Sequence, residues 1–213
     1  MKIVCISGKA GSGKDTFAGY LSELGKAAGK SVLVIHYADL LKYICKEYFG
    51  WDGKKDEQGR TLLQNVGTNM VRARDPDFWV SFVDDLLYVF PDKWDYVLIP
   101  DARFPNEVSY LRRHGHDTVL VHIDRPDGAA RLTAEQAAHP SETAMDDFPA
   151  DVTVMNNDDL LKLRSCAKEV AEWLGMTEAK APSGVTFHEK EENPFTALTS
   201  PLFGGWDVFG PRW

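Results

Sequence analysis

Residues Gly8 to Thr16 have the sequence GKAGSGKDT, and this stretch decides the fold. It contains the pattern Gly-x4-Gly-Lys, with Gly8, Gly13 and Lys14 at the fixed positions. A short apolar run precedes it, and residues at helical spacing follow it. Glycines let successive backbone N–H groups face inward around an anion, and the following helix directs its positive end to the same place. We therefore predict a phosphate-binding loop for ATP, in which Lys14 reaches the β- and γ-phosphates.

The remaining residues of the loop are assigned to the same nucleotide. Gly11 lies within the loop, and Asp15 occupies the position after the lysine, where Ser or Thr normally binds Mg²⁺. Asp15 could hold the magnesium directly or through water, and Thr16 is placed to bind an α-phosphate oxygen. We therefore assign Asp15 and Thr16 to both ATP and the metal. A dinucleotide-binding fingerprint is excluded, because it would require glycine at position 16.

Strands and helices alternate along the chain. The predicted strands are 3–6, 31–37, 96–99, 118–123 and 152–155, and the predicted helices are 14–28, 38–48, 61–74, 77–89, 105–114 and 158–174, with a loop at 50–60. This alternation predicts an α/β fold with a parallel five-stranded sheet flanked by helices. Ligands of such sheets bind beyond the carboxyl ends of the strands, which is where the phosphate-binding loop begins.

The last part of the chain differs in character. Residues 1–177 are predicted to form one domain, and residues 124–149 within it are polar, rich in proline and partly mobile. Residues 178–213 contain scattered Pro and Gly together with aromatic residues, without helical or strand periodicity. Because unordered tails are usually poor in aromatic residues, we predict an irregular strap packed on its own domain or on a partner subunit. A homodimer therefore stays open, and a loose terminus is the alternative.

Composition limits the partners and the compartment. The chain has 213 residues and a formal net charge of -8, so we expect neither general nucleic-acid binding nor binding to an anionic membrane. Its three cysteines are far apart and form no CxxC pair, which indicates a reducing compartment. We see neither a signal peptide at the start nor a run long enough to span a membrane, and we expect a cytoplasmic protein.

A second group of residues follows the strand predicted at 96–99. Asp101 ends this apolar run and is interpreted as the acid on the magnesium side, as a general base on the acceptor, or as a helix cap. Arg103 lies on the same rim, where its guanidinium suits bidentate binding of phosphate. Each further cation that could meet a second phosphate could equally be a solvated surface charge. These cations are Lys42, Arg60, Arg72, Arg125 and Arg131.

Other side chains near the predicted site also have simpler interpretations. The aromatic residues Tyr37, Phe78, Trp79 and Phe104 could stack on a base, but such residues more often belong to the core. His139 and Glu142, in the sequence HPSE, resemble a metal-binding pair at first sight. We do not predict a metal site there, because the sequence offers no further ligands nearby.

These motifs together resemble a known family. The chain is similar to the phage-type deoxynucleoside monophosphate kinases of the P-loop kinase superfamily, over most of residues 1–174. The strings that carry the resemblance are GKAGSGKDT, ADLLK at 38–42, RTLLQNVGT at 60–68, PDFWV at 76–80, DARFPNE at 101–107 and HPSE at 139–142. The family has a basic side chain within the loop near position 10, where this chain has Ala10 preceded by Lys9.

The resemblance implies a fold, an activity and a set of site residues. It implies a nucleoside monophosphate kinase fold with a mobile lid within about 124–149, and transfer of the γ-phosphate of ATP, with Mg²⁺, to a deoxynucleoside 5′-monophosphate for phage DNA synthesis. On this basis Leu41 and Lys42 contact the acceptor and the lid holds Arg125 and Arg131 near ATP. We expect Lys14, Arg103 and Asp101 to act in catalysis, and Arg60 and Arg72 to join Arg103 at the acceptor.

Two other hypotheses remain open. The chain could be a P-loop kinase with another small acceptor, such as dephospho-coenzyme A, phosphomevalonate or a modified nucleotide, because a fold does not fix the substrate. It could also be a nucleotide-binding protein without turnover, for which the aromatic residues of the C-terminal segment are the supporting feature.

Overall fold

The computed structural model describes residues 1–126, 132–157, 159–178 and 186–187. A single sheet with the strand order β2-β3-β1-β4-β5-β6 lies at the centre of the described structure. Its first five strands are parallel, and β6 is antiparallel to β5. The strands are β1 (Lys2–Ser7), β2 (Val32–Val34), β3 (Tyr96–Ile99), β4 (Asp117–Asp124), β5 (Val152–Met155) and β6 (Thr186–Phe187). The predicted five parallel strands are thus confirmed, and one short strand is added to them.

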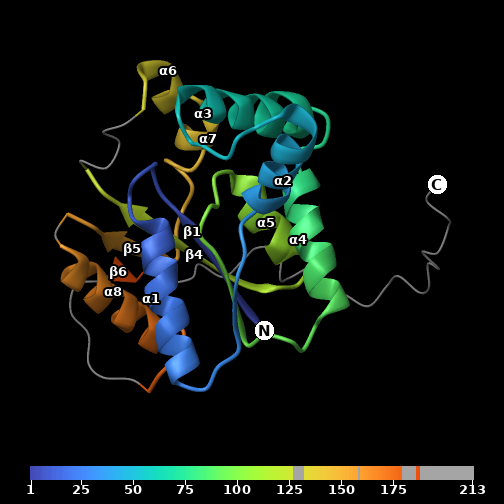
Figure 1. The fold of residues 1–213 in the computed structure, drawn as a ribbon. Coiled ribbons are helices and arrows are strands. Elements are labelled where there is room, and N and C mark those ends of the chain that lie inside the picture. The colour runs from blue at the N-terminus through green and yellow to red at the C-terminus, as the bar shows by residue number, and fades with distance from the viewer. Residues whose placement is uncertain (127–131, 158, 179–185, 188–213) are drawn as a thin grey trace.

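Helices cover both faces of this sheet (Figure 1). They are α1 (Lys14–Ala27), α2 (Ala38–Phe49), α3 (Glu57–Gln64), the π-helix η1 (Asn65–Arg72), α4 (Phe78–Val89), α5 (Pro105–Arg113), α6 (Ala134–Ala137), α7 (Pro140–Thr143) and α8 (Leu160–Trp173). Figure 1 shows α3, α6 and α7 gathered at the end of the molecule where β1 leads into the phosphate-binding loop. None of the helices in the described part is long and apolar enough to span a bilayer.

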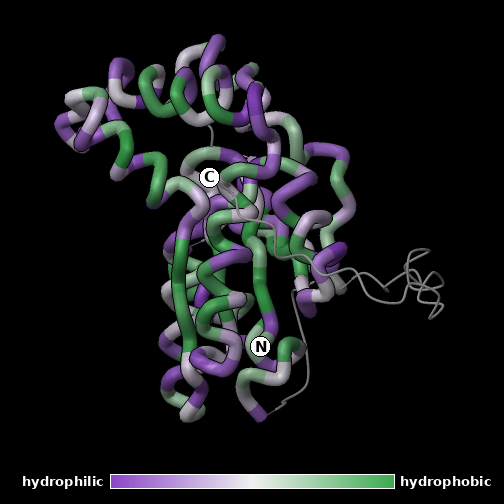
Figure 2. Tube along the Cα trace, turned by 90° about the vertical axis from the view of Figure 1, so that its right-hand side faces the viewer, coloured by the Kyte–Doolittle hydropathy of each residue, from purple (hydrophilic) through white to green (hydrophobic). Residues whose placement is uncertain are grey.

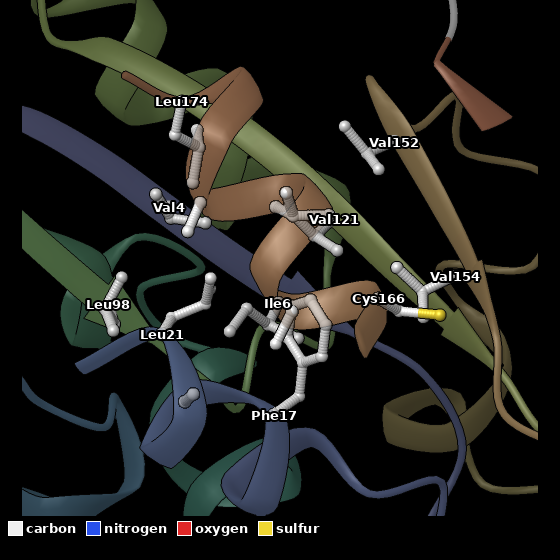
Figure 3. Packing of buried hydrophobic residues seen from close by; sticks show 14 of the residues in the cluster. Val4, Ile6, Phe17, Leu21, Leu98, Val121, Val152, Val154, Cys166 and Leu174 are labelled. Carbon is white, nitrogen blue, oxygen red and sulfur yellow. The ribbon is translucent and has the colours of Figure 1, made fainter. Parts of the chain in front are cut away.

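The two faces of the sheet form two separate hydrophobic cores. Successive strand residues point to opposite faces, so Val4 and Ile6 of β1 belong to one core, and Ile3 and Cys5 belong to the other. The first core is packed by α1 and α8, and Figure 3 shows Phe17 of α1 against these strands. The second core is packed mainly by α4 and α5. In Figure 2 the strands in the middle of the molecule are mostly hydrophobic, as burial on both faces requires.

The helical stretch predicted at 61–74 begins earlier and is not regular. It consists of α3, which starts at Glu57 inside the loop predicted at 50–60, followed by η1. Asp56 starts α3 by accepting a hydrogen bond from the backbone N–H of Gly59 at 2.8 Å. Gly59 is required, because a Cβ there would lie 2.0 Å from the carbonyl oxygen of Lys54. Because glycine is usually unfavourable within helices, this glycine favoured the prediction of a loop where α3 begins.

Two further segments differ from the prediction. The region 124–149, for which no period was visible, contains the short helices α6 and α7, each begun by a side-chain cap from Thr133 or His139. Within the segment 178–213, predicted to be irregular, Thr186–Phe187 forms the two-residue strand β6, which pairs with β5. Most of that segment lies outside the described residues, so the domain boundary and the irregular strap stay predictions.

Candidate active site

The phosphate-binding loop joins β1 to α1, and its glycines are needed by its geometry. Gly13 has a φ of 99° and forms the N-cap of α1. A Cβ at Gly13 would lie 2.8 Å from the Asn156 amide nitrogen, and one at Gly8 would lie 2.4 Å from the carbonyl oxygen of Ile123. The loop is thus held against β4 and the residues that follow β5, with its backbone at the positive end of α1.

Lys14 folds back over this loop. Its Nζ donates hydrogen bonds to the carbonyl oxygens of Gly8 at 2.7 Å and Lys9 at 2.9 Å. Burial of the side chain, reinforced by the positive charge of Arg103, lowers the pKa of Lys14 to about 8. A cation that is desolvated in this way gains strongly from an anion placed beside it.

Asp15 pairs with a residue that the sequence did not single out. His36 Nε2 lies 3.0 Å from Asp15 Oδ1. This contact lowers the pKa of the Asp15 carboxyl and raises that of the His36 imidazole. The Asp15 side chain is 78% exposed, and its second oxygen has no hydrogen-bond partner among the described residues. One carboxylate oxygen therefore remains available to a ligand.

Asp101 caps the start of α2. Its two oxygens accept hydrogen bonds from the backbone N–H groups of Tyr37 and Ala38, each at 3.0 Å. Burial raises the pKa of the Asp101 carboxyl, and these hydrogen bonds oppose that shift. The capping role, one of the three interpretations of this residue, is confirmed, and its role in catalysis or metal binding stays a prediction.

Arg103 lies between the loop and α7. Its Nη1 donates to the carbonyl oxygen of Ser141 at 3.0 Å and forms an ion pair with Glu142. Its backbone N–H donates to Glu107 Oε2 at 2.7 Å. The residue is therefore anchored at both ends, and the guanidinium lines the cavity described below.

Arg72 is fixed by the same carboxylate. Its Nη2 lies 2.6 Å from Glu107 Oε1, and its guanidinium carbon lies 4.0 Å from the centre of the Phe104 ring. The side chain of Glu107 is only 2% exposed, so this ion pair is largely removed from water. Burial raises the pKa of Glu107, whereas Arg72 and the N–H groups of Arg103 and Phe104 lower it.

A cavity of about 320 Å³ joins these groups. Most of the predicted site residues line it: Gly11, Lys14, Asp15, Leu41, Lys42, Arg60, Arg72, Asp101 and Arg103. Gly8, Gly13 and Thr16 belong to the loop and first turn of α1 but do not line the cavity, and Thr16 is exposed. Arg125 Nη1 donates to the carbonyl oxygen of Gly11 at 3.2 Å, whereas Arg131 lies outside the described residues.

In the part of the cavity wall formed by α3 and η1, sequence reasoning identified Arg60 and Arg72 but missed four other residues. Leu63, Gln64, Gly67 and Thr68 all line it. The side chains of Gln64 and Thr68 make no hydrogen bond to another described residue. These residues lie within the string RTLLQNVGT, which supported the resemblance but gave no individual role. Interruptions of α-helical geometry by π-helix are common at functional sites, and Gly67, Thr68 and Arg72 of η1 line the cavity.

The aromatic residues have mainly structural roles. Tyr37 is 4% exposed and Trp79 is 3% exposed, and the Trp79 Nε1–H donates to the carbonyl oxygen of Gly67 at 3.0 Å. Phe104 stacks under Arg72, while Phe78 packs edge-to-face on Trp79. Tyr37 and Trp79 thus belong to the core, in agreement with the simpler interpretation, although both contribute to the cavity wall.

Comparison with solved structures supports the fold class. The APS kinase CysC of Mycobacterium tuberculosis, whose structure was solved in complex with AMPPNP and APS, matches with a TM-score of 0.50. The match covers 82% of this chain and 97% of that one, at 16% sequence identity. At this identity the likeness shows the fold alone, a parallel sheet with helices on both faces.

Comparison of sequences defines the family. The family model for deoxynucleotide monophosphate kinase matches residues 34–166, and the chain therefore belongs to this family. The deoxynucleotide monophosphate kinase of Enterobacteria phage T4 is 30% identical over 111 residues. That alignment covers 51% of this chain and 43% of the T4 protein, so the match spans less than half of the relative.

Proposed function

We propose that the protein transfers the γ-phosphoryl group of ATP to the phosphate of a deoxynucleoside 5′-monophosphate. The observation that carries this proposal is the cavity, which connects a phosphate-binding loop to a second wall bearing Lys42, Arg60 and Arg72. A single phosphate-binding site would account for the loop but not for these cations. Family membership and the acceptor in the name of the T4 relative also support this choice of substrate.

On the donor side, the loop would hold the triphosphate. Lys14 donates to carbonyl oxygens of the loop at 2.7 and 2.9 Å. We infer that phosphate oxygens replace these carbonyls, because a charge-assisted hydrogen bond to phosphate is stronger than one to a neutral carbonyl. Arg125, already within 3.2 Å of the loop at Gly11, would approach the same phosphates from the lid.

The residues present fit a magnesium ion that is held mostly by its substrate. Mg²⁺ keeps several waters and usually takes one or two carboxylates together with substrate phosphates. The free oxygen of Asp15 beside the loop is such a ligand, whereas both oxygens of Asp101 accept backbone hydrogen bonds. Asp15 would thus be the main protein ligand, with Thr16 and Asp101 as the other predicted ones. The bound ion would neutralise charge on the β- and γ-phosphates.

On the acceptor side, the cations would hold the monophosphate and the remaining wall would hold the nucleoside. Lys42 has an exposed ion pair with Asp39 at 2.9 Å, which a phosphate could replace at little cost. Leu41 and Leu63 offer apolar contacts to a base. The unpartnered side chains of Gln64 and Thr68 are available to the polar edge of that base, because an amide and a hydroxyl can each donate and accept.

The chemistry needs positioning rather than a covalent intermediate. An oxygen of the acceptor monophosphate would attack the γ-phosphorus of ATP while the bond from that phosphorus to the oxygen of ADP breaks. Lys14 and Arg103 would stabilise the negative charge of the transferred group. The products are ADP and a deoxynucleoside diphosphate, and closure of the lid would keep water from acting as the acceptor.

The test is an assay of ADP release against a panel of acceptors. With ATP and Mg²⁺, we expect turnover with at least one deoxynucleoside monophosphate and none with dephospho-coenzyme A or phosphomevalonate. Turnover with one of those acceptors alone would support a P-loop kinase of another substrate class. Tight binding of ATP without turnover on any acceptor would favour the non-catalytic nucleotide-binding protein.

The partners and the location follow from this proposal. A small nucleotide in the host cytoplasm would be the substrate, with neither direct nucleic-acid binding nor attachment to a membrane. The net charge of -8 agrees with the expectation of no direct nucleic-acid binding, because an excess of negative charge disfavours binding to a polyanion. A homodimer remains part of the proposal, and sedimentation of the full chain tests it.

Binding of ATP should be accompanied by uptake of protons near pH 8. The pKa of Lys14 is lowered to about 8, so the side chain titrates near this pH. A bound triphosphate raises that pKa, and the protein should take up a fraction of a proton, while affinity falls as pH rises above 8. The terminal phosphate, whose pKa is near 6, contributes little at this pH.

Titration calorimetry at pH 8 in buffers of different ionisation enthalpy measures this uptake. The variant Lys14→Met serves as the control, because it should bind ATP more weakly and without the proton linked to Lys14. An observed enthalpy that is independent of the buffer for the unaltered chain would contradict the prediction.

A further inference from the structure

Glu142 lies in α7 within the HPSE sequence and has no role in the function proposed above. Its Oε2 accepts a hydrogen bond from the backbone N–H of Ala10 at 2.9 Å, and its Oε1 forms the ion pair with Arg103. The side chain is 6% exposed. One buried carboxylate therefore joins three parts of the site: the phosphate-binding loop, the segment after β3 and the segment that holds α7.

The surroundings of Glu142 fix its orientation. Lys9 Nζ donates to the carbonyl oxygen of Glu142 at 2.7 Å and forms an ion pair with Asp146. The loop is therefore also hydrogen-bonded to the main chain of α7. His139 caps the same short helix, because its Nδ1 accepts from the backbone N–H of Ser141 at 3.2 Å. The carboxylate is thus held toward the loop from both sides.

The charges around Glu142 explain why a carboxylate is useful there. Lys14 and Arg103 are the two cations that the proposed function assigns to the transferred phosphoryl group, and their positive charges repel each other. Arg103 accordingly lowers the pKa of Lys14, while Glu142 raises it. An anion beside both cations reduces this repulsion.

We propose that Glu142 is a positioning residue that holds Arg103 and the outer part of the phosphate-binding loop in the arrangement needed for phosphoryl transfer. Both of its oxygens are occupied by donors, so it acts through Ala10 and Arg103 and does not touch the reacting atoms. Glutamine could not replace it fully, because its amide has a single acceptor oxygen. The effect on turnover rests on the proposed function, whereas the effect on the loop does not.

The first measurement needs no substrate. The exchange rate of the Ala10 amide hydrogen is measured by NMR on the full chain, on Glu142→Ala and on Glu135→Ala. Glu135 lies in α6 and is exposed, so the Glu135→Ala variant removes the same charge from the same segment. We expect exchange to be about tenfold faster in Glu142→Ala, since a charge-assisted hydrogen bond is lost, and unchanged in Glu135→Ala. Equal exchange in all three chains would overturn the proposal.

The second measurement is a double-mutant cycle with Arg103→Met. Glu142→Ala should lower kcat/KM for the accepted monophosphate about tenfold when Arg103 is present, and at most about threefold when Arg103 is replaced. A purely structural role of Glu142 would give the same loss in both backgrounds, and that result would overturn the proposal. If Glu142→Ala does not fold, Glu142→Gln keeps the size of the side chain and one acceptor.

The two measurements separate this proposal from the proposed function. If the unaltered chain phosphorylates no monophosphate, the proposed function fails and the exchange of the Ala10 amide still decides the role of Glu142. If the chain is active but the exchange and the cycle show no effect of Glu142, the proposed function stands and the positioning role is wrong.

Discussion

Replacing Lys14 by Met should lower kcat/KM for phosphoryl transfer by about a thousandfold. Its ammonium is the loop cation that would stabilise the negative charge of the transferred phosphoryl group in the transition state. Removal of one well-placed donor at such a site typically lowers the rate by about 10² to 10³. The side chain is 9% exposed, so its charge acts in surroundings where water screens little. Initial rates in the ADP-release assay measure the loss.

The matched control for this variant is Lys26→Met. Lys26 lies in the last turn of the same helix, is exposed, and has no ion pair among the described residues. It should keep full activity. Lys14→Met should also keep its melting temperature, because Met removes a charge whose burial is unfavourable. Activity of Lys14→Met within threefold of the unaltered chain would remove this lysine from the mechanism.

Features that repeat along the chain could be predicted from the sequence. Strands such as β3, which is buried at every position, and helices with a continuous apolar stripe, such as α1, follow from periodicity because both need a partner surface. The phosphate-binding loop could be predicted because its glycines and lysine are close in sequence. The predicted fold and loop therefore agree with the structure.

Features that depend on distant contacts could not be predicted. Glu107 and Glu142 are 35 residues apart and both anchor Arg103, through its main chain and its side chain respectively. Both carboxylates lie in strings that carry the family resemblance, DARFPNE and HPSE, but neither string indicates a contact with Arg103. Asp101 was singled out for its position after a strand, but its cap on α2 depends on two N–H groups more than sixty positions away. The geometry of the cavity wall in η1 likewise needed coordinates.

Replacing Glu107 by Ala should lower the free energy of unfolding by about 3–5 kcal/mol, the usual cost of removing one partner from a buried ion pair. The variant would leave the guanidinium of Arg72, whose side chain is only 12% exposed, without its anion. It would also leave the backbone N–H groups of Arg103 and Phe104, now bonded at 2.7 and 3.0 Å, without an acceptor. Urea denaturation followed by circular dichroism measures the change.

The control for this loss in the free energy of unfolding is Glu47→Ala, in α2. Glu47 is exposed, so the same deletion there should change stability by no more than about 0.5 kcal/mol. A loss in Glu107→Ala as small as that control would mean that Arg72 finds another partner or water. If the loss is large, Arg72→Met in the Glu107→Ala chain should restore part of it, since the unpaired cation is then gone. Such recovery would show that much of the loss in Glu107→Ala comes from the unpaired charge of Arg72.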